Sequence, residues 1–351
     1  MQEPLKGTPG RRTTLADVAA AAGVSRALAS IVMRGADGAG EATRSRVLEV
    51  ARELGYRPDS RARLLRSSRT RLLGVTFTLA EPFHGEVVES IYAAAEAAGL
   101  DVVLSAVGPR RAEARAVESL LDAGVEAVLM IAPSSAPEAL AVYARQVPVV
   151  SLLSPLAVEG VDGVRSDDGA GIRAAVEHLV SLGHRDIVHI DGAGAVAASE
   201  RRAAYRAVMN EYGLAVRVIR GGAGEEDGLR AAGELLAGGP VPDAIVAFND
   251  RCALGVLEAA RRAGLEVPGD LSVAGYDDSQ LARLSHVQLT TVSQEAPRLA
   301  EAAVACAAAR LSSEDPGSLV PPPQLVVRAT TGPSPRASSV SSSGHPPIPR
   351  R

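Results

Sequence analysis

The chain of 351 residues has no tryptophan, only two cysteines and an aromatic content of 3%. Cys252 and Cys306 lie far apart in alanine-rich stretches without metal-site spacing, so the sequence predicts two buried, reduced thiols. No uncharged apolar run approaches membrane-spanning length, and the opening residues MQEPLKGTPGRR lack the apolar core of a signal peptide. These absences favour a cytoplasmic protein over an exported or membrane-spanning one.

Catalytic motifs are also missing from the sequence. It contains no G-x-S-x-G elbow, no phosphate-binding GxxxxGK[ST] loop and no His/Cys cluster at metal-ligand spacing. We therefore expect no enzymatic activity, no cofactor and no metal ion.

Charge is distributed unevenly along the chain. Residues 1–71 contain 14 Lys/Arg and 7 Asp/Glu, whereas residues 72–351 contain 23 Lys/Arg and 34 Asp/Glu. The length predicts more than one domain, and the apolar content of 46% is sufficient for a large core. A basic head on an acidic body is typical of a phosphate-binding module joined to a domain that stays off nucleic acid.

The stretch TLADVAAAAGVSRALASIVMR (14–34) predicts two short helices. Thr14, with an acidic residue three positions later, forms a capping box at the first helix. Gly23 allows a left-handed turn, and Ser25 caps a second helix over residues 26–33. This arrangement predicts a helix-turn-helix whose second helix fits the major groove; the alternative is an ordinary alanine-rich helical hairpin.

A third amphipathic helix is predicted over residues 43–54, ended by Gly55. Three helices of this size can bury a small core. After them, Pro58 forces an extended backbone and Asp59 is placed to cap a further short helix over residues 60–66.

From residue 72 onward, short apolar strands alternate with helices. Unbroken apolar strands of this kind predict parallel sheets that are covered on both faces, here as two doubly wound lobes. The predicted strands are 72–78, 101–106, 126–132, 148–153, 187–191, 216–219, 244–248 and 271–276. The predicted helices are 85–98, 111–122, 137–145, 169–182, 200–212, 227–237 and 251–263.

The runs DVAAAAGVS and GYRPDSRARLL, with their spacing, resemble the LacI family of transcriptional regulators, and the resemblance extends to about residue 331. It implies an all-α helix-turn-helix domain joined to a two-lobed α/β domain of the periplasmic-binding-protein-like type I fold. It also implies that residues 289–293, 297–312 and 324–328 cross back to complete the lobes. The expected segments are a flexible arm (1–12), the DNA-binding domain (13–58), a hinge (59–71), the effector-binding and dimerisation domain (72–332) and a disordered tail (333–351).

The resemblance also implies which residues meet DNA. Arg26 can bind a guanine with two hydrogen bonds, while Ala27 and Ile31 offer apolar contacts, unless Ile31 is a core residue. The family pattern VSxxTVSRVLN is here VSRALASIVMR, in which Leu28 replaces the threonine and Ile31 the arginine. The expected DNA-binding residues are Ser25, Arg26, Ala27, Ser30, Ile31, Arg34, Ala62 and Leu65.

In the family, the hinge folds into a helix on the operator and inserts a leucine into the minor groove. Leu65 stands at the matching position, and Ala62 matches the small residue that allows close approach. The alternative is a flexible tether, which is the default for an isolated segment of this length.

By the same resemblance, effector-binding residues lie near the carboxyl ends of strands. Arg201, Asn249 and Asp277 belong to the phrases ASERRAAYRA, AFNDRCALG and VAGYDDS. A surface ion-pair network is an alternative for Arg201. The expected effector-binding residues are Thr78, Phe83, Arg201, Asn249, Asp277 and Gln294. The expected helix caps are Asp168, Asp250 and Asp278, and His184 is expected to be structural.

Together these features predict an effector-gated repressor that binds a near-palindromic operator as a homodimer. Residues 333–351 contain no leucine heptads of the kind that make tetramers. The low aromatic content favours a sugar or sugar derivative over a nucleoside or purine as the effector. The alternatives are a stand-alone solute binder, disfavoured by the basic head, and a hydrolase-type enzyme, for which only the fold would argue.

Overall fold

The computed structural model describes residues 13–56, 69–314, 316 and 321–334. It divides into two compact units, Met1–Thr70 and Arg71–Arg351, which we call the head and the body. The predicted arm, most of the predicted hinge, including Ala62 and Leu65, and the tail from residue 335 lie outside the described residues.

The head consists of three helices: α1 (Leu15–Ala21), α2 (Arg26–Met33) and α3 (Glu41–Glu53). Helices α1 and α2 are bent 107° relative to each other, within the range of helix-turn-helix motifs. All three contribute to one small core, made of Val18, Ala19, Ala22, Ala29, Val32, Val47 and Ala51.

The predicted caps of the head are confirmed. The Thr14 amide donates to Asp17 Oδ2 at 2.8 Å, and the Thr14 hydroxyl accepts from the Asp17 amide, so the capping box is complete. Gly23 has a φ of +64°, and the Ser25 hydroxyl accepts from the Leu28 amide at 3.1 Å. Local sequence therefore determines where these two helices begin and how they turn.

The first lobe of the body is a five-stranded parallel sheet of order β2-β1-β3-β4-β5. Helices α5 and α12 share a core on one face, and α6 and α7 share a core on the other. The strands are β1 (Leu72–Thr78), β2 (Asp101–Val107), β3 (Ala127–Ile131), β4 (Val149–Leu152) and β5 (Val161–Val164). The helices are α5 (Pro82–Ala97), α6 (Glu113–Asp122), α7 (Pro137–Ala144) and α12 (Ala296–Leu311).

The second lobe is a six-stranded sheet of order β11-β10-β9-β8-β6-β7, in which only β11 is antiparallel. Its two faces are covered by α8 with α9 and by α10 with α11. The strands are β6 (Ile187–Asp191), β7 (Arg217–Arg220), β8 (Ala244–Ala247), β9 (Ser272–Asp277), β10 (Thr290–Ser293) and β11 (Gln324–Val326). The helices are α8 (Asp168–Ser181), α9 (Ala198–Glu211), α10 (Glu225–Ala237) and α11 (Asp250–Arg262).

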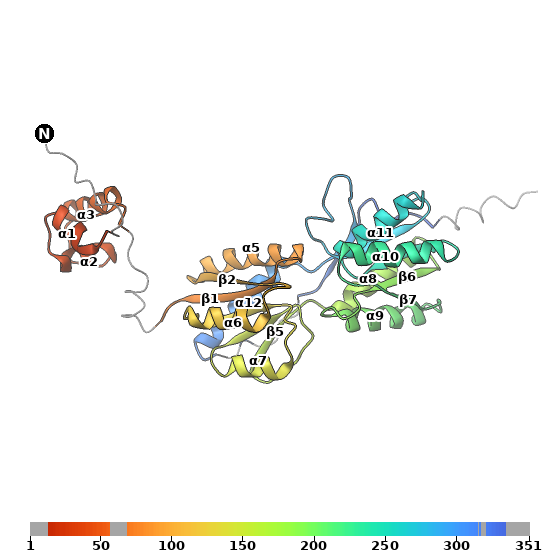
Figure 1. Cartoon of the computed structure of the whole chain (residues 1–351), viewed down its shortest axis with the longest axis horizontal. Helices are drawn as coiled ribbons and strands as arrows, with labels where there is room; N and C mark the ends of the chain where they lie inside the picture. Colours follow the sequence, from red (N-terminus) through yellow and green to blue (C-terminus); the bar gives the residue numbers. More distant parts are fainter. Residues whose placement is uncertain (1–12, 57–68, 315, 317–320, 335–351) are drawn as a thin grey trace, which may run out of the picture. The chain divides into compact units, whose positions relative to one another are not determined.

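The chain passes between the lobes three times, as expected. It crosses at residues 165–167, returns at 294–295 to place α12 in the first lobe, and crosses again before β11. Figure 1 shows the blue helix α12 among the orange and yellow elements of the first lobe. The predicted helix 297–312 thus completes the first lobe, and the predicted strands 289–293 and 324–328 complete the second.

Two glycines set the spacing of α10 and α11. A Cβ on Gly228 would lie 2.1 Å from the Cys252 carbonyl oxygen, and one on Gly255 would lie 2.0 Å from the Glu225 carbonyl oxygen. Because backbone meets backbone at both points, neither helix can shift without repacking the other. This pair fixes the N-terminus of α11, which carries several candidate site residues.

The predicted state of the two cysteines is confirmed: Cys252 and Cys306 are buried and form no disulfide. Across the described ranges, no single helix is long and apolar enough to cross a membrane, although α1 and α2 taken together across their bend match such a span in length and composition. Among the described residues, no group of three His, Cys, Asp or Glu side chains could hold a metal ion.

Candidate functional site

The exposed surface of α2 carries the residues predicted to meet DNA. Arg26 and Ala27 are exposed in its first turn, while Ala29 and Val32 turn inward to the head core. Arg26 is therefore free to reach a base edge, because nothing in the head requires its side chain for packing. A guanidinium in the first turn of a recognition helix is suited to guanine O6 and N7.

The remaining predicted residues of α2 differ in how far they are committed to the head. Ser25 is exposed, and its hydroxyl oxygen accepts the capping bond while its proton remains a possible donor. Arg34 folds back so that its Nε donates to the Ser30 carbonyl at 3.1 Å. Ile31 is half-buried but lies outside the head core, which argues against its alternative role as a core residue.

In the body, strained backbone gathers at one edge of each sheet. Left-handed backbone is uncommon for residues other than glycine and often marks functional sites. Seven such residues lie at or after the carboxyl ends of β3, β4, β6, β9 and β10: Ala132, Leu153, Ala193, Ala197, Asp277, Asp278 and Glu295. This is the edge at which doubly wound sheets bind ligands.

Arg201 on α9 is the centre of the polar groups at this edge. Its side chain is 6% exposed; Nε donates to Asp168 Oδ1 at 2.8 Å, and Nη1 donates to the Phe248 carbonyl at 2.8 Å. Nη2 lies 3.8 Å from Asp277 Oδ1, and the guanidinium stacks 3.7 Å from the centre of the Tyr276 ring. The charge is thus buried, paired and held in a fixed orientation.

Gln294 continues this arrangement to the segments that connect the lobes. Its Nε2 donates to Asp277 Oδ1 at 2.7 Å, and its Oε1 accepts from the Ser166 hydroxyl at 2.6 Å. Ser166 and Gln294 lie on two separate crossings of the chain. Three predicted effector residues, Arg201, Asp277 and Gln294, are therefore joined in one polar chain.

The carboxyl group of Asp277 lies in an unusual electrostatic environment. Burial raises the pKa of Asp277 well above its ordinary value, and the Arg201 charge opposes this rise. The negative charges of Asp250 and Glu81 raise the pKa further, and Glu81 comes from the first lobe. Asp277 is thus poised to gain from a ligand that donates hydrogen bonds to it.

Two predicted helix caps are wrong by one residue. Asp167, not Asp168, caps α8 by accepting from the Ala170 amide at 3.0 Å, which leaves Asp168 free to pair with Arg201. Asn249, predicted to bind effector, caps α11 by accepting from the Cys252 amide at 2.8 Å.

Asp250 is therefore not the cap of α11. Its buried carboxylate accepts from the amide of Ser279 at 2.7 Å and from the hydroxyl of Thr291. Burial raises the pKa of Asp250 to about 7, against the hydrogen bonds from these residues. Both errors arise because each helix begins one residue earlier than the apolar periodicity predicts.

Asp278 is not a helix cap either. Its φ of +54° is incompatible with the extended backbone of an N-cap residue, and only turns follow it. Its carboxylate instead accepts from Arg328 Nη2 at 2.6 Å.

The two first-lobe candidates do not join the polar chain around Arg201. Phe83 is 5% exposed and packs into the first-lobe core, not against an open surface. The backbone amide of Thr78 donates to His84 Nδ1 at 3.1 Å, which holds the loop between β1 and α5. Sequence reasoning missed Glu81 and Tyr276 as participants.

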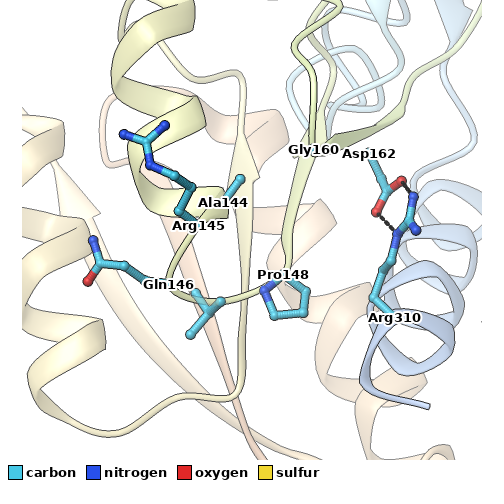
Figure 2. A pocket seen from close by; sticks show the side chains of 8 residues that line it. Ala144, Arg145, Gln146, Pro148, Gly160, Asp162 and Arg310 are labelled. Atoms are coloured by element: carbon cyan, nitrogen blue, oxygen red, sulfur yellow. Dashed lines mark hydrogen bonds and ion pairs between the residues drawn. The ribbon is translucent and has the colours of Figure 1, made fainter. Parts of the chain in front are cut away.

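A separate cavity of about 310 Å³ lies at the amino ends of the first-lobe strands, near Pro148 and Gly160, where β4 and β5 begin. Figure 2 shows Arg310 and Asp162 paired at one side of it. The two hydrogen bonds from the guanidinium to the carboxylate are 2.8 and 2.7 Å long. Ligands bind doubly wound sheets at carboxyl ends, and this guanidinium is already paired. We therefore place the candidate effector site at the Arg201 edge.

A helix-turn-helix head and a two-lobed body with buried polar groups at its crossings define a class: a DNA-binding domain joined to a ligand-sensing domain. Two family models match the chain. Residues 14–59 match bacterial regulatory proteins of the lacI family, and residues 176–331 match the periplasmic binding protein-like domain.

Solved structures agree with both matches. A LacI transcriptional regulator from a Rhodococcus species is 49% identical, with a TM-score of 0.74, covering 75% of this chain and 99% of that one. The Lac repressor dimer bound to operator and the anti-inducer ONPF is 30% identical, with a TM-score of 0.79 and coverage of 92% and 100%. A complex of the transcriptional regulator CelR with cellobiose is 30% identical, with a TM-score of 0.66 and coverage of 91% and 100%.

The chain belongs to the LacI family of transcriptional regulators. It is a DNA-binding regulator and not an enzyme, as the sequence predicts.

Proposed function

We propose that this regulator represses transcription as a homodimer that binds a near-palindromic operator and responds to a sugar or sugar derivative held between its lobes. The observation that carries the proposal is the buried chain of Arg201, Asp277 and Gln294 at the interlobe crossings. Such a chain places donors and acceptors together, and each hydroxyl of a polyol both donates and accepts.

The aromatic rings at this edge support a sugar over a nucleobase. The faces of Tyr276 and Phe248 both lie against the Arg201 guanidinium, at 3.7 and 4.8 Å from the ring centres. A purine needs a ring face on which to stack, whereas a polyol needs hydrogen-bonding groups. The relative that is solved with cellobiose is consistent with this choice.

Dimerisation follows from the small size of the head. One bundle offers few base contacts, so two heads on a two-fold axis double them and require a site with matching symmetry. The related Lac repressor is solved as a dimer on its operator. Within each half-site we assign base contacts to Arg26, Ala27 and Ile31, with Ser25, Ser30 and Arg34 on phosphates.

The hinge completes the DNA-binding proposal. Leu65 would enter the minor groove and bend the duplex, and Ala62 would allow the two hinges to approach closely. Leu65→Ala should therefore weaken binding and also reduce the bend. Unchanged affinity and bend in this variant would identify the segment as a tether.

Selection of binding sites from random DNA by the full-length protein tests the operator proposal. We expect an enriched sequence with two inverted half-sites, and Arg26→Ala should lose about 1–3 kcal/mol per half-site and relax the preference at one base pair. Enrichment of a single unsymmetrical site by a monomer would refute the dimer. Ser30→Ala serves as a comparison, because loss of a phosphate contact weakens all sequences equally.

A further inference from the structure

Two acidic residues near the start of α5 reach from the first lobe to the second. Glu81 Oε1 lies 3.3 Å from Arg251 Nη1. One turn further on, Glu86 accepts from the Gln280 backbone amide at 2.5 Å and pairs with Arg283. Both contacts therefore join the lobes away from the crossings of the chain.

The second of these contacts extends into a series of alternating charges. Arg283 donates to the Asp278 carbonyl at 2.6 Å and lies 3.7 Å from its carboxylate. Asp278 in turn accepts from Arg328, whose other nitrogen donates to the Leu289 carbonyl at 2.8 Å. We name Glu86, Arg283, Asp278 and Arg328 the interlobe ion-pair chain.

Burial separates this chain from ordinary surface ion pairs. The side chains of Glu86, Asp278 and Arg328 are only 16%, 15% and 14% exposed, although Arg283 is 46% exposed. A charge-assisted bond to the Gln280 amide fixes the first-lobe end of the chain, and the Leu289 carbonyl fixes the second-lobe end. Networks with fixed ends contribute more than isolated exposed pairs.

Asp278 is also the direct neighbour of Asp277, the candidate effector residue. The φ angles of the two residues are +114° and +54°, so both are held in left-handed backbone that side chains disfavour. One carboxylate of this strained pair faces Arg201 and Gln294, and the next belongs to the ion-pair chain. The Asp277 site and the interlobe ion-pair chain are therefore joined by a single peptide bond.

We propose that the interlobe ion-pair chain holds the ligand-free lobes at a fixed spacing, and that Asp278 is the positioning residue that links this spacing to the Asp277 site. The link to Asp277 rests on the proposed function; the effect on spacing does not. A ligand that forms hydrogen bonds with Asp277 would alter the bond between Asp278 and Arg283. It would thereby shift the equilibrium between close and separated lobes.

Single-molecule energy transfer between the lobes tests the proposal in ligand-free, full-length protein. Dyes on Glu96→Cys in α5 and Arg206→Cys in α9 report the spacing; both positions are exposed, and both native cysteines are buried. Labelled chains are diluted in unlabelled ones to exclude signals between subunits. Glu86→Gln and Arg283→Gln should each lower the ratio of close to separated lobes by about twofold to fivefold.

Matched variants separate this effect from general damage. Glu89→Gln removes the same charge from an exposed position of α5 and should leave the ratio unchanged. The double variant of Glu86 and Arg283 should match either single variant, since either substitution alone already removes the ion pair between these two side chains. Asp278→Asn should lower the ratio and Asp278→Glu should largely restore it.

An unchanged ratio in both Glu86→Gln and Arg283→Gln would overturn the proposal. A ratio that changes in these variants, in a protein whose ligand response survives Asp277→Ala, would refute the proposed effector site and leave the ion-pair chain standing. The two failures are therefore distinguishable.

Discussion

The two lobes contribute different chemistry to the region where they meet. The second lobe supplies Arg201, Asp168 and Asp277, whose side chains are bonded to one another and largely buried. The first lobe supplies Glu81 and Glu86, which reach across from the start of α5. The difference indicates that the second lobe carries a buried, mutually bonded set of charges, which the first lobe meets through two acidic side chains of α5 and its cap.

Burying the Arg201 charge has a structural cost. A buried guanidinium must be desolvated, and its pairing with Asp168 and its stacking on Tyr276 offset that loss. Glu81 and Arg251 stay 25% and 33% exposed, so separating them costs far less. Breaking this contact between the lobes therefore costs less than breaking the buried pairs within the second lobe.

Replacing the central charge of the second lobe should have the largest effect. Arg201→Met leaves the buried Asp168 with only the longer 3.8 Å contact to Arg165, so we expect a loss of about 3–5 kcal/mol in the free energy of unfolding by urea. The matched change in the first lobe, Glu81→Gln, should cost below about 1 kcal/mol. Equal losses would contradict the division of roles between the lobes.

Acid should destabilise both lobes, because each lobe buries a histidine with a lowered pKa. Burial lowers the pKa of His84 in the first lobe to about 4, and it does the same for His189 in the second lobe. The unfolded chain binds protons near pH 6.5, whereas these folded histidines bind them only near pH 4. The stabilisation that each histidine contributes by staying neutral is therefore fully present above pH 6.5. It is lost as the pH falls towards 4, by about 1–3 kcal/mol per histidine.

Urea unfolding at several pH values measures this loss in each lobe. His84→Gln and His189→Gln should each flatten the acid side of the profile relative to the wild-type chain. A profile as steep as wild type in both variants would show that other groups cause the acid sensitivity.

A smaller difference is expected between two tight glycines. A Cβ on Gly171 would lie 2.5 Å from the Tyr276 hydroxyl, and that ring cannot move because Arg201 lies on its face. A Cβ on Gly74 of the first lobe would lie 3.0 to 3.3 Å from atoms of Leu120 and Val125, so these side chains need to give by only a few tenths of an ångström. Gly171→Ala should cost about 1–3 kcal/mol and Gly74→Ala less. Thermal melting of both variants measures these losses, and a lower melting temperature for Gly74→Ala than for Gly171→Ala would contradict the expected order.

Much of the architecture follows from the sequence because strand and helix periods are local properties. The capping box at Thr14 and the turn at Gly23 are set by residues within one turn of each other. Strand β5 was not predicted, because its sequence VDGV combines an exposed glycine and an aspartate at a sheet edge. Its pairing with β4, not its own pattern, makes it a strand.

The candidate site was predictable only in part. Arg201, Asp277 and Gln294 were found by resemblance, and the structure brings them together. Asp168 and Tyr276 were missed as partners of Arg201, since they come from separate segments that only the folded sheet places side by side. Asp278 was assigned as a cap because sequence does not reveal its left-handed backbone.

A thermal-shift screen of the full-length protein and Asp277→Ala, against a panel of sugars, sugar derivatives and nucleosides, tests the central claim most directly. A ligand at 100 times its dissociation constant adds about 2.7 kcal/mol, which should raise the melting temperature on the order of 2–4 °C per kcal/mol. We expect a polyhydroxylated compound to give this shift with the wild-type protein and none with Asp277→Ala, which should still bind operator. A full shift retained by Asp277→Ala would contradict the account and place effector binding elsewhere.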